Sequence, residues 1–430
     1  MAYEMKKVIV YGAGISGQGV ADVLEHQGWE VKIYTDDMGG FEQLLDGVEL
    51  LVLSPGVAPD KPEVQLARER GLKVLPEIEI AFNQFKGKMA GITGTNGKTT
   101  TTTLVGEMLK TLNVPVKVAG NIGLSLTKEL EGLGEDAWVA AELSSFQLET
   151  VEKFAPQIAC VLNLTPDHLE RHHTLEAYYA AKQNICNKQS GEQYTVLNYD
   201  DTNLATWSMN LHSQVCYFSQ KRDLPEGVCV QNNKFVVRWG GKETTVCAVK
   251  DMQIFGSHNV DNVLAAIAVG YLAGCSAENM ARVIRNFPGV EHRLEYIRTI
   301  NDVKYYNDSK ATNTDSAVKA LQAFPNNKIV LIAGGHDKQT DLGEFMRCVQ
   351  EHVAELILLG EAKERFAKAA QGLGISNIHI VNDYEAAVSL AHKLAKPAQV
   401  VLLSPACSSY DMFKNFEERG KKYKELVMAL

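Results

Sequence analysis

The sequence lacks the features of several protein classes. No apolar stretch approaches the roughly 18 residues that a membrane-spanning helix needs, and the longest, 263–275, predicts a buried helix. The eight cysteines form no CxxC pair and mostly lie in apolar runs, which predicts free thiols in a reducing cytoplasm and no cysteine metal site. Lys and Arg total 43 against 52 Asp and Glu, with no basic block, which argues against nucleic acid as a partner.

The remaining composition is that of an ordinary globular protein, with 45% hydrophobic and 22% charged residues in 430. Apolar runs alternate with helical patterns along the chain, which is typical of parallel sheets covered by helices on both faces. New strand–loop–helix starts near Lys88 and after Pro288-Gly289 divide the pattern. We therefore expect an α/β protein of three domains, at 1–88, 89–289 and 290–430.

The first chemical motif is GAGISG at 12–17, a glycine-rich turn between an apolar strand and a helix. Such a turn lets a diphosphate approach the helix N-terminus closely. Asp36 ends the next predicted strand, where an acid that binds a ribose would stand. The pattern therefore suits a dinucleotide, although the glycines could equally serve strand–helix packing alone.

The second motif is GTNGKTT at 94–100, again between a strand and a helix. Its backbone N–H groups and Lys98 could hold a polyphosphate, and the Thr99 hydroxyl could reach Mg²⁺. The usual phosphate-loop pattern has Gly where this chain has Ile92, so the loop is a variant. We predict a nucleoside triphosphate site here, the alternative being a glycine-rich turn with a solvated lysine.

Two acidic or basic segments follow in the predicted central domain. Glu142 ends an apolar strand, where a carboxylate beside a phosphate loop could bind Mg²⁺, although strand-end acids are usually solvated. His168 and His172 lie four residues apart and could share zinc on a helix. His168 could instead bind a second Mg²⁺, or both histidines could lie on the surface behind a capping Asp167.

Three polar segments of the last domain each follow a predicted strand directly: 307–313, 334–338 and 403–411. Each alone would be a turn with a helix cap, but together they occupy the crevice position for ligands in open α/β sheets. Ser409 and Asp411 are expected at the N-cap of the last helix, near Phe416.

The chain resembles the Mur ligase family along nearly its whole length. The segments that carry the resemblance occur in the family's order and are GTNGKTT, AELSSFQLE, NLTPDHLERH, YYAAKQNI, SHNVDN, HRLE, NDSKATNTDS and SPACSSYDMFKNFEERG. The resemblance implies Rossmann-like first and third domains around a central ATPase-type domain with a phosphate loop. It implies a cytoplasmic, monomeric ATP-dependent ligase that joins D-glutamate to UDP-N-acetylmuramoyl-L-alanine through an acyl phosphate, in peptidoglycan precursor synthesis.

The resemblance also implies roles for individual residues. For ATP these are Gly94, Thr95, Asn96, Gly97, Lys98, Thr99, Thr100, Asn259, Asn262, Arg293, Asp308 and Lys310. The ligands of two Mg²⁺ ions would be Thr99, Glu142, His168 and a carbamylated Lys182. The UDP substrate would contact Gly14, Ile15, Ser16, Gly17, Thr35, Asp36 and Asn121. D-Glutamate would contact Thr312, Lys338, Ser409, Tyr410 and Phe416. No role is left for NAD or a membrane.

Three rival functions stay open at this point. A sister ligase could add another amino acid or a folate glutamate tail, and the last domain would decide between them. An NAD-dependent dehydrogenase would use the first glycine motif but would leave the loop at Lys98 unexplained. A nucleotide-dependent switch would not need lysines at 182, 310 and 338.

Overall fold

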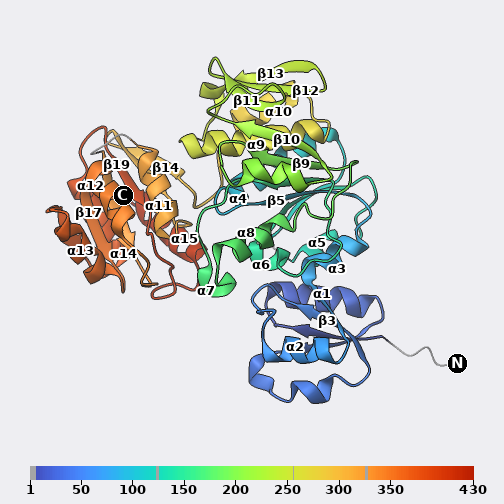
Figure 1. The fold of residues 1–430 in the computed structure, drawn as a ribbon. Helices are drawn as coiled ribbons and strands as arrows, with labels where there is room; N and C mark the ends of the chain where they lie inside the picture. The colour runs from blue at the N-terminus through green and yellow to red at the C-terminus, as the bar shows by residue number, and fades with distance from the viewer. Residues whose placement is uncertain (1–5, 123–124, 255, 325–327) are drawn as a thin grey trace. The chain divides into compact units, whose positions relative to one another are not determined.

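The computed structural model describes residues 6–122, 125–254, 256–324 and 328–430, and it contains three sheets (Figure 1). The alternation of strands and helices confirms the predicted α/β class. All eight cysteines are free and buried, as expected from their apolar surroundings. None of the helices within the described ranges is long and apolar enough to cross a membrane.

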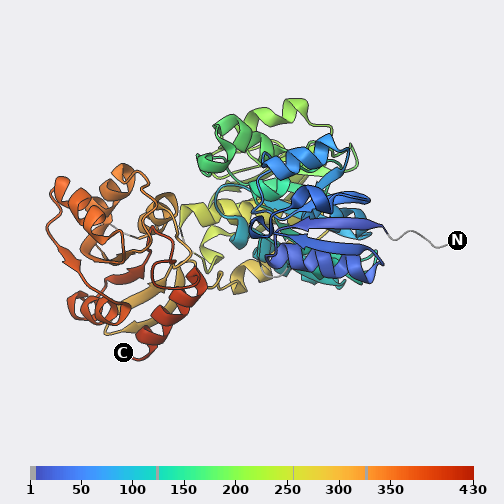
Figure 2. The same ribbon diagram turned by 90° about the horizontal axis from the view of Figure 1, so that it is seen from below.

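The first sheet has four parallel strands in the order β2-β1-β3-β4. Its elements are β1 Lys7–Tyr11, α1 Ile15–His26, β2 Glu30–Tyr34, β3 Val48–Leu53, α2 Pro62–Glu69, β4 Lys73–Pro76 and α3 Glu77–Gln84. Successive residues of β1 face opposite sides, Val8 and Val10 toward α1, Ile9 and Tyr11 toward α2. Because both faces are covered, the two central strands β1 and β3 are mostly apolar and buried (Figures 1 and 2).

The second sheet has nine strands in the order β13-β12-β11-β10-β9-β8-β5-β7-β6, antiparallel only at β11-β12-β13. Its strands are β5 Lys88–Thr93, β6 Val116–Gly120, β7 Trp138–Glu142, β8 Ile158–Val161, β9 Tyr194–Asn198, β10 Gln214–Ser219, β11 Gly227–Gln231, β12 Lys234–Trp239 and β13 Lys242–Ala248. Its helices are α4 Lys98–Leu109, α5 Leu126–Leu130, α6 Ser145–Leu148, α7 Leu169–His172, α8 Leu175–Gln183, α9 Ser257–Leu272 and α10 Ala277–Asn286. Ile92 pairs with Glu142 across β5 and β7, so the phosphate loop and the acid share one sheet edge.

The third sheet has the order β14-β15-β19-β16-β17-β18, with only the β14–β15 pair antiparallel. Its strands are β14 Glu295–Ile300, β15 Val303–Asn307, β16 Ile329–Gly334, β17 Val353–Leu359, β18 Ile378–Ile380 and β19 Val400–Leu403. Its helices are α11 Thr314–Gln322, α12 Gly343–His352, α13 Lys363–Gly372, α14 Tyr384–Leu394 and α15 Phe416–Met428. Helices α11, α12 and α13 cover one face, while α14 and α15 cover the other.

Short 3₁₀ turns complete the fold at Asp36–Met38, Phe41–Leu44, Lys110–Leu112, Leu204–Asn210 and Val249–Asp251. Strands β6, β14 and β18 were not expected from the sequence. The last helix begins at Phe416 and is capped by Asn415, whose side chain accepts from the Glu418 amide. The expected cap at Ser409 or Asp411 is therefore wrong, because the chain runs on through a loop before the helix starts.

The chain forms two compact units, Met1–Met252 with Val260–Asn286, and Gln253–Asn259 with Phe287–Leu430. The first two sheets thus lie in one unit, although the sequence predicts a boundary at residue 88. Two buried glutamates of α3 explain their association. Glu77 Oε1 accepts from the amide and hydroxyl of Thr127 at 2.7 and 2.5 Å, and Glu79 accepts from the amides of Glu152 and Lys153 at 3.1 and 2.8 Å. The three-domain boundaries themselves stay a prediction.

Candidate active site

The phosphate loop follows β5 and leads into α4. Gly94 and Gly97 have φ values of 150° and 84°, which favour glycine. A Cβ at Gly97 would lie 2.2 Å from Asn262 Oδ1, so the loop also needs glycine for space. Lys98 Nζ donates to the carbonyl oxygens of Gly94 and Thr95, both at 2.9 Å. The lysine therefore lies along the loop, where it can meet a phosphate held by the loop's N–H groups.

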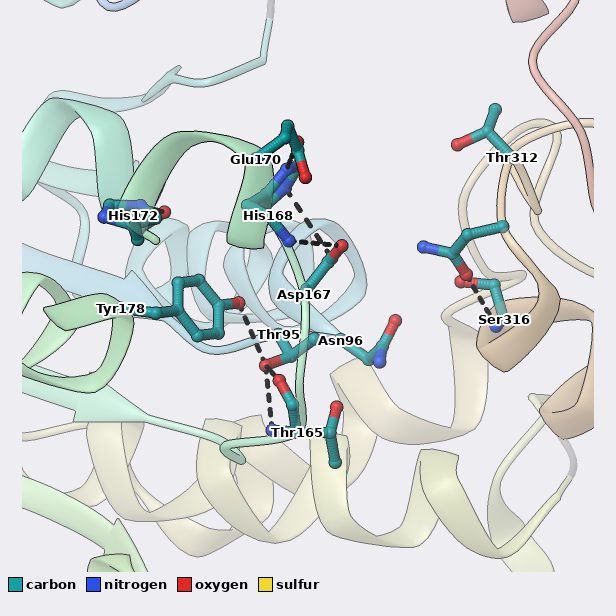
Figure 3. Close-up of polar contacts among 12 residues, drawn as sticks. Thr95, Asn96, Thr165, Asp167, His168, Glu170, His172, Tyr178, Thr312 and Ser316 are labelled. Carbon is teal, nitrogen blue, oxygen red and sulfur yellow. Dashed lines mark hydrogen bonds and ion pairs between the residues drawn. The ribbon is translucent and has the colours of Figure 1, made fainter. Parts of the chain in front are cut away.

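The phosphate loop is tied to the segment after β8, as Figure 3 shows around Thr95. The Thr95 hydroxyl donates to the carbonyl of Thr165 at 3.0 Å and lies 3.1 Å from the Tyr178 hydroxyl. The Asn96 amide donates to Asn163 Oδ1 at 2.9 Å, and Asn163 Nδ2 returns a bond to the Asn96 carbonyl at 3.0 Å. These partners were not predicted, although Asn163 stands just after a strand, where the other polar segments were found.

Glu142 ends β7 and is only 2% exposed. Its Oε1 accepts from Asn121 Nδ2 at 2.9 Å, whereas its Oε2 is buried with no hydrogen-bond partner. A buried carboxylate oxygen without a donor is costly unless a cation completes it. The donor chemistry at this sheet edge therefore fits Mg²⁺, with Thr99, buried at the start of α4, as a second oxygen. Asn121, which the resemblance assigns to the UDP substrate, donates to this acid in the structure; its contact with the substrate stays a prediction.

Lys182, on α8, is also buried, with 2% of its surface exposed. Its Nζ donates to the Gly94 carbonyl at 2.9 Å and lies 4.7 Å from the centre of the Tyr178 ring. Burial, helped by the nearby charge of Lys98, holds the pKa of the Lys182 amine well below its usual range. The structure thus brings Lys182 to the phosphate loop, as a reactive amine more than as a surface cation.

The two histidines of the NLTPDHLERH segment have different surroundings. His168 caps α7 with a φ of 52°, and its ring nitrogens lie 3.6 Å from Asp167 and 3.4 Å from Glu170 (Figure 3). His172 is buried, with Nε2 3.0 Å from the Ser145 hydroxyl. Burial lowers the pKa of His172 to about 4. Because His172 faces protein partners, the geometry argues against a zinc ion shared by the two rings and leaves His168 as the candidate ligand.

Helix α9 brings one of its two predicted asparagines to the phosphate loop. Asn262 is buried and accepts from the Thr101 hydroxyl at 3.3 Å. Asn259 is buried as well, and its amide donates to the Gly256 carbonyl at 3.0 Å, but it belongs to the second compact unit.

The glycine-rich turn of the first sheet is shaped by two glycines. A Cβ at Gly17 would lie 1.8 Å from the Gly12 carbonyl oxygen, so this glycine is needed for strand–helix packing. A Cβ at Gly14 would meet nothing within 4 Å, so its side is open. Gly14 caps α1 without a side chain, and Ile15 is 66% exposed. The start of α1 therefore presents N–H groups that suit a diphosphate.

Asp36 is engaged by two side chains that the sequence did not indicate. The Tyr11 hydroxyl donates to Oδ1, and Lys61 Nζ donates to Oδ2 in an ion pair. These contacts hold the pKa of Asp36 below its usual value, Lys61 contributing most. Beside it, the Thr35 hydroxyl donates to Asp37 at 2.5 Å. An acid that is already paired with a lysine is a poorer acceptor for a ribose hydroxyl than a free carboxylate.

In the second unit, Asp308 is buried just after β15. Its Oδ2 accepts from the Ser404 hydroxyl at 2.8 Å and its Oδ1 from the Leu294 amide at 3.2 Å. Burial raises the pKa of Asp308 to about 6, while the charge of Arg293 opposes the shift. Arg293 Nε is itself buried without a hydrogen-bond partner. Lys310 Nζ lies 5.3 Å from the centre of the Phe416 ring. The structure thus gathers the predicted groups after β15, β19 and α10.

The predicted glutamate residues occupy neighbouring loops of the second unit. Lys338 Nζ lies 3.5 Å from the Thr312 carbonyl oxygen. The Lys338 loop is fixed by Asp337, which accepts from Arg365 at 2.6 and 2.8 Å. The His336 amide donates to the Ser408 carbonyl at 3.0 Å, next to Ser409. Ser409 is buried, whereas 72% of Tyr410 is exposed.

A fully buried arginine, Arg419 of α15, joins two of these loops and was not predicted. It donates to the Ser309 hydroxyl and carbonyl at 2.9 and 2.7 Å, and to the Cys407 carbonyl at 3.0 Å. The Ser309 hydroxyl donates in turn to the Phe416 carbonyl at 2.8 Å. Arg419 therefore fixes the loops after β15 and β19 against α15.

Elsewhere in the described part of the chain, one group of three potential metal ligands occurs, Glu291, His292 and Glu295. Lys424 pairs with both glutamates, at 3.1 Å to Glu291. An ammonium group therefore already provides their charge balance.

Sheet-edge loops with a glycine-rich phosphate-type turn, a buried acid and a buried lysine are typical of an enzyme that uses a nucleotide. Residues 92–270 match the Mur ligase middle domain, and residues 292–407 match the Mur ligase glutamate ligase domain. The chain belongs to the Mur ligase family.

Relatives similar over their full length bear one name, UDP-N-acetylmuramoylalanine–D-glutamate ligase. The protein from Lachnoclostridium phytofermentans is 41% identical, over 99% of this chain and 98% of its own. That from Thermoanaerobacter sp. is 42% identical over the whole of both chains.

Solved structures agree in fold. UDP-N-acetylmuramate-alanine ligase MurC from Thermotoga maritima has a TM-score of 0.61 at 21% identity, over 99% of this chain and 100% of its own. A pseudomurein peptide ligase type C from Methanothermus fervidus has a TM-score of 0.61 at 18% identity, covering 99% of both chains.

Proposed function

We propose that the protein joins D-glutamate to UDP-N-acetylmuramoyl-L-alanine at the expense of ATP, in the cytoplasmic synthesis of peptidoglycan precursors. The observation that carries the proposal is the full-length similarity, at 41–42% identity, to relatives named for this reaction. The site supports it, because a ligase must activate a carboxylate and this sheet edge gathers phosphate-binding and cation-binding groups.

The ATP site in this proposal is the phosphate loop Gly94–Thr100 with Asn262. In the second unit, Asn259, Arg293, Asp308 and Lys310 are the proposed nucleotide contacts. Mg²⁺, which Mur ligases require, would be held by Thr99, Glu142 and His168, and when bound it neutralises phosphate charge. The unpartnered Glu142 Oε2 is the local support for this assignment. Lys98 would stabilise the negative charge of the transferred phosphoryl group in the transition state.

Lys182 would act as a carbamate. A neutral amine attacks the carbon of CO₂, loses one proton and becomes an N-carboxylate anion. The buried position of Lys182 favours the neutral amine, and a cation there would oppose Mg²⁺. Its Nζ is 2.9 Å from the Gly94 carbonyl, so the added carboxylate would lie at the phosphate loop.

The reaction proceeds in two steps. The substrate carboxylate oxygen attacks the γ-phosphorus of ATP, its P–O bond to ADP breaks, and an acyl phosphate forms. The neutral amine of D-glutamate then attacks the acyl carbon, and the tetrahedral species expels phosphate while the amine loses a proton. Protein groups bind, orient and exclude water, since water would hydrolyse the acyl phosphate.

The two substrates would bind at different units. UDP would lie at the start of α1, against Gly14, Ile15, Ser16 and Gly17, with its uridine near Thr35 and Asp36. D-Glutamate would bind at the loops that carry Thr312, Lys338, Ser409, Tyr410 and Phe416. Lys338 and the amides near Ser409 would meet its carboxylates, while Phe416 would form a wall.

A phosphate-release assay tests the function directly. The protein is incubated with ATP, Mg²⁺, UDP-N-acetylmuramoyl-L-alanine and one amino acid at a time, with product mass as confirmation. We expect release with D-glutamate and none with L-glutamate, L-alanine or L-lysine. Turnover with another amino acid alone would identify a sister ligase, and turnover only with a folate substrate would identify the folate branch. Sedimentation in the same buffer tests the proposed monomer.

A further inference from the structure

Arg171 reaches from the central sheet's α7 to the loop that follows β3 of the first sheet. Its side chain is 14% exposed. One terminal nitrogen donates to the Val57 carbonyl at 2.9 Å, and the other lies 3.5 Å from the Gly56 carbonyl. Both sheets belong to one compact unit, so these contacts are internal to it.

The same guanidinium is held on its own side by the segment after β7. Its Nε and one terminal nitrogen donate to Glu149 Oε2 at 3.3 and 2.9 Å, and its centre lies 5.0 Å from the centre of the Phe146 ring. Glu149 Oε1 lies 3.5 Å from His172 Nδ1. The segment that includes Phe146 and Glu149 begins at the strand end that bears Glu142.

The loop after β3, to which Arg171 donates, is hydrogen-bonded to the glycine-rich turn. Ser54 donates from its hydroxyl to the Gly12 carbonyl at 3.1 Å and from its amide to the Tyr11 carbonyl at 3.0 Å. The Val57 amide donates to the Ser54 carbonyl at 2.9 Å. A Cβ at Gly12 would lie 2.8 Å from Ser54, which shows how closely the loop and turn fit. A shift of Val57 would therefore move the turn.

We propose that Arg171 is a positioning residue that sets the UDP-binding turn relative to the acidic segment of the ATP site. The inference rests on the proposed function, because it assigns the turn to the UDP substrate. Only the planar fork of arginine can serve two carbonyls and a carboxylate at once, whereas a lysine offers one compact charge. Among the described residues, the Arg171 side chain forms no hydrogen bond with any that is assigned to the substrates or the metal, so it acts through the loop after β3.

A small cavity lies beside this contact. It has a volume of about 10 Å³ and is lined by Ser54, Val57, Glu77, Gln147 and Arg171 among others. Without the guanidinium, the Gly56 and Val57 carbonyls would lose their side-chain donor, and Glu149 would lose its cation. The loop would then be held less firmly, and the UDP-binding turn would lose its fixed position.

Arg171→Met and Arg171→Lys test the proposal, with Arg70→Met as the matched control. Arg70 is an exposed arginine of the first sheet that pairs only with Glu42 among the described residues. For Arg171→Met we expect the KM for UDP-N-acetylmuramoyl-L-alanine to rise about tenfold or more, with the KM for ATP and for D-glutamate changed less than about threefold. For Arg171→Lys we expect a KM for the UDP substrate between those of wild type and Arg171→Met. Arg70→Met should have the wild-type KM values.

Calorimetric titration of UDP-N-acetylmuramoyl-L-alanine without ATP gives a second readout. We expect its affinity to fall in Arg171→Met as the KM rises, and Glu149→Gln to add little in the double variant, because both act on one contact. Wild-type affinity in Arg171→Met, or equal losses for all three substrates, would overturn the inference. If Arg171→Met does not fold, the same comparison in Arg171→Lys decides. Absence of ligation by the wild-type protein would instead overturn the proposed function.

Discussion

Asn121 holds Glu142 by one oxygen, through a 2.9 Å hydrogen bond to Oε1, and Oε2 is left buried without a donor. The two residues follow neighbouring strands, Gly120 pairing with Glu142 across β6 and β7. The backbone N–H of Asn121 also donates to the backbone carbonyl of Glu142 at 2.8 Å, which holds the two residues side by side. A carboxylate fixed in this manner presents its second oxygen in one direction, toward a cation.

Glu142→Gln should therefore abolish turnover without loss of the fold. The amide is nearly isosteric but cannot balance a divalent charge, so we expect kcat to fall by about 100-fold or more. Asn121→Ala should lower kcat less and should require more Mg²⁺ for half-maximal rate, because it removes the residue that orients the Glu142 carboxylate but leaves the charge of that carboxylate. Wild-type Mg²⁺ dependence in Glu142→Gln would contradict the assignment. Glu135→Gln, an exposed control in the loop before β7, should behave as wild type.

Lys182→Ala should be inactive, and short carboxylic acids should restore part of its activity. An acid of this kind can occupy the space of the missing carbamate and return the negative charge. Activity is measured over a series of formate and acetate concentrations, with chloride as the ionic-strength control. Lys188→Ala, at the exposed end of the following turn, should need no rescue. If Lys182→Ala keeps wild-type turnover, the lysine is a packing residue of α8.

Asp308→Asn should stabilise the fold at neutral pH and impair catalysis. Burial raises the pKa of Asp308 from 3.8 to about 6, so the folded state holds its proton more tightly than the unfolded state. Stability from this group is thus complete below about pH 4 and is lost as pH rises toward 6; at pH 7.5 the loss is of the order of 2–3 kcal/mol. Thermal unfolding at pH 4 and 7.5 checks it: the gain of Asp308→Asn should shrink at pH 4.

Features that depend on local sequence pattern and on position relative to a strand could be predicted from the sequence. The alternation of apolar runs with helical patterns predicted the α/β class, because buried parallel strands are mostly apolar runs. Lys98 and Glu142 were both placed at strand ends, and their neighbourhood followed from parallel pairing.

Contacts between distant residues were not predictable. Lys61 pairs with Asp36, and Arg419 binds Ser309, but no periodicity links either pair. The cap at Asn415 was missed because Ser409 and Asp411 offer the same capping groups earlier in the chain. The contacts between the first two sheets were not predicted either, since buried glutamates such as Glu77 resemble ordinary helix-start acids in sequence.

The first glycine turn should bind a uridine diphosphate and not a dinucleotide. A dinucleotide would need a free acid at the end of β2, but Asp36 is paired with Lys61 and Tyr11. A uridine diphosphate needs only the N–H groups at the start of α1, and Lys61 adds positive charge nearby. The protein is titrated in a calorimeter with UDP-N-acetylmuramoyl-L-alanine, UDP and NADH. We expect the first to bind most tightly, UDP to compete with it, and NADH to bind no better than ADP. Lys61→Met should weaken the UDP substrate about tenfold while leaving ATP unaffected. Tight NADH binding that UDP does not displace would instead assign the turn to a dinucleotide.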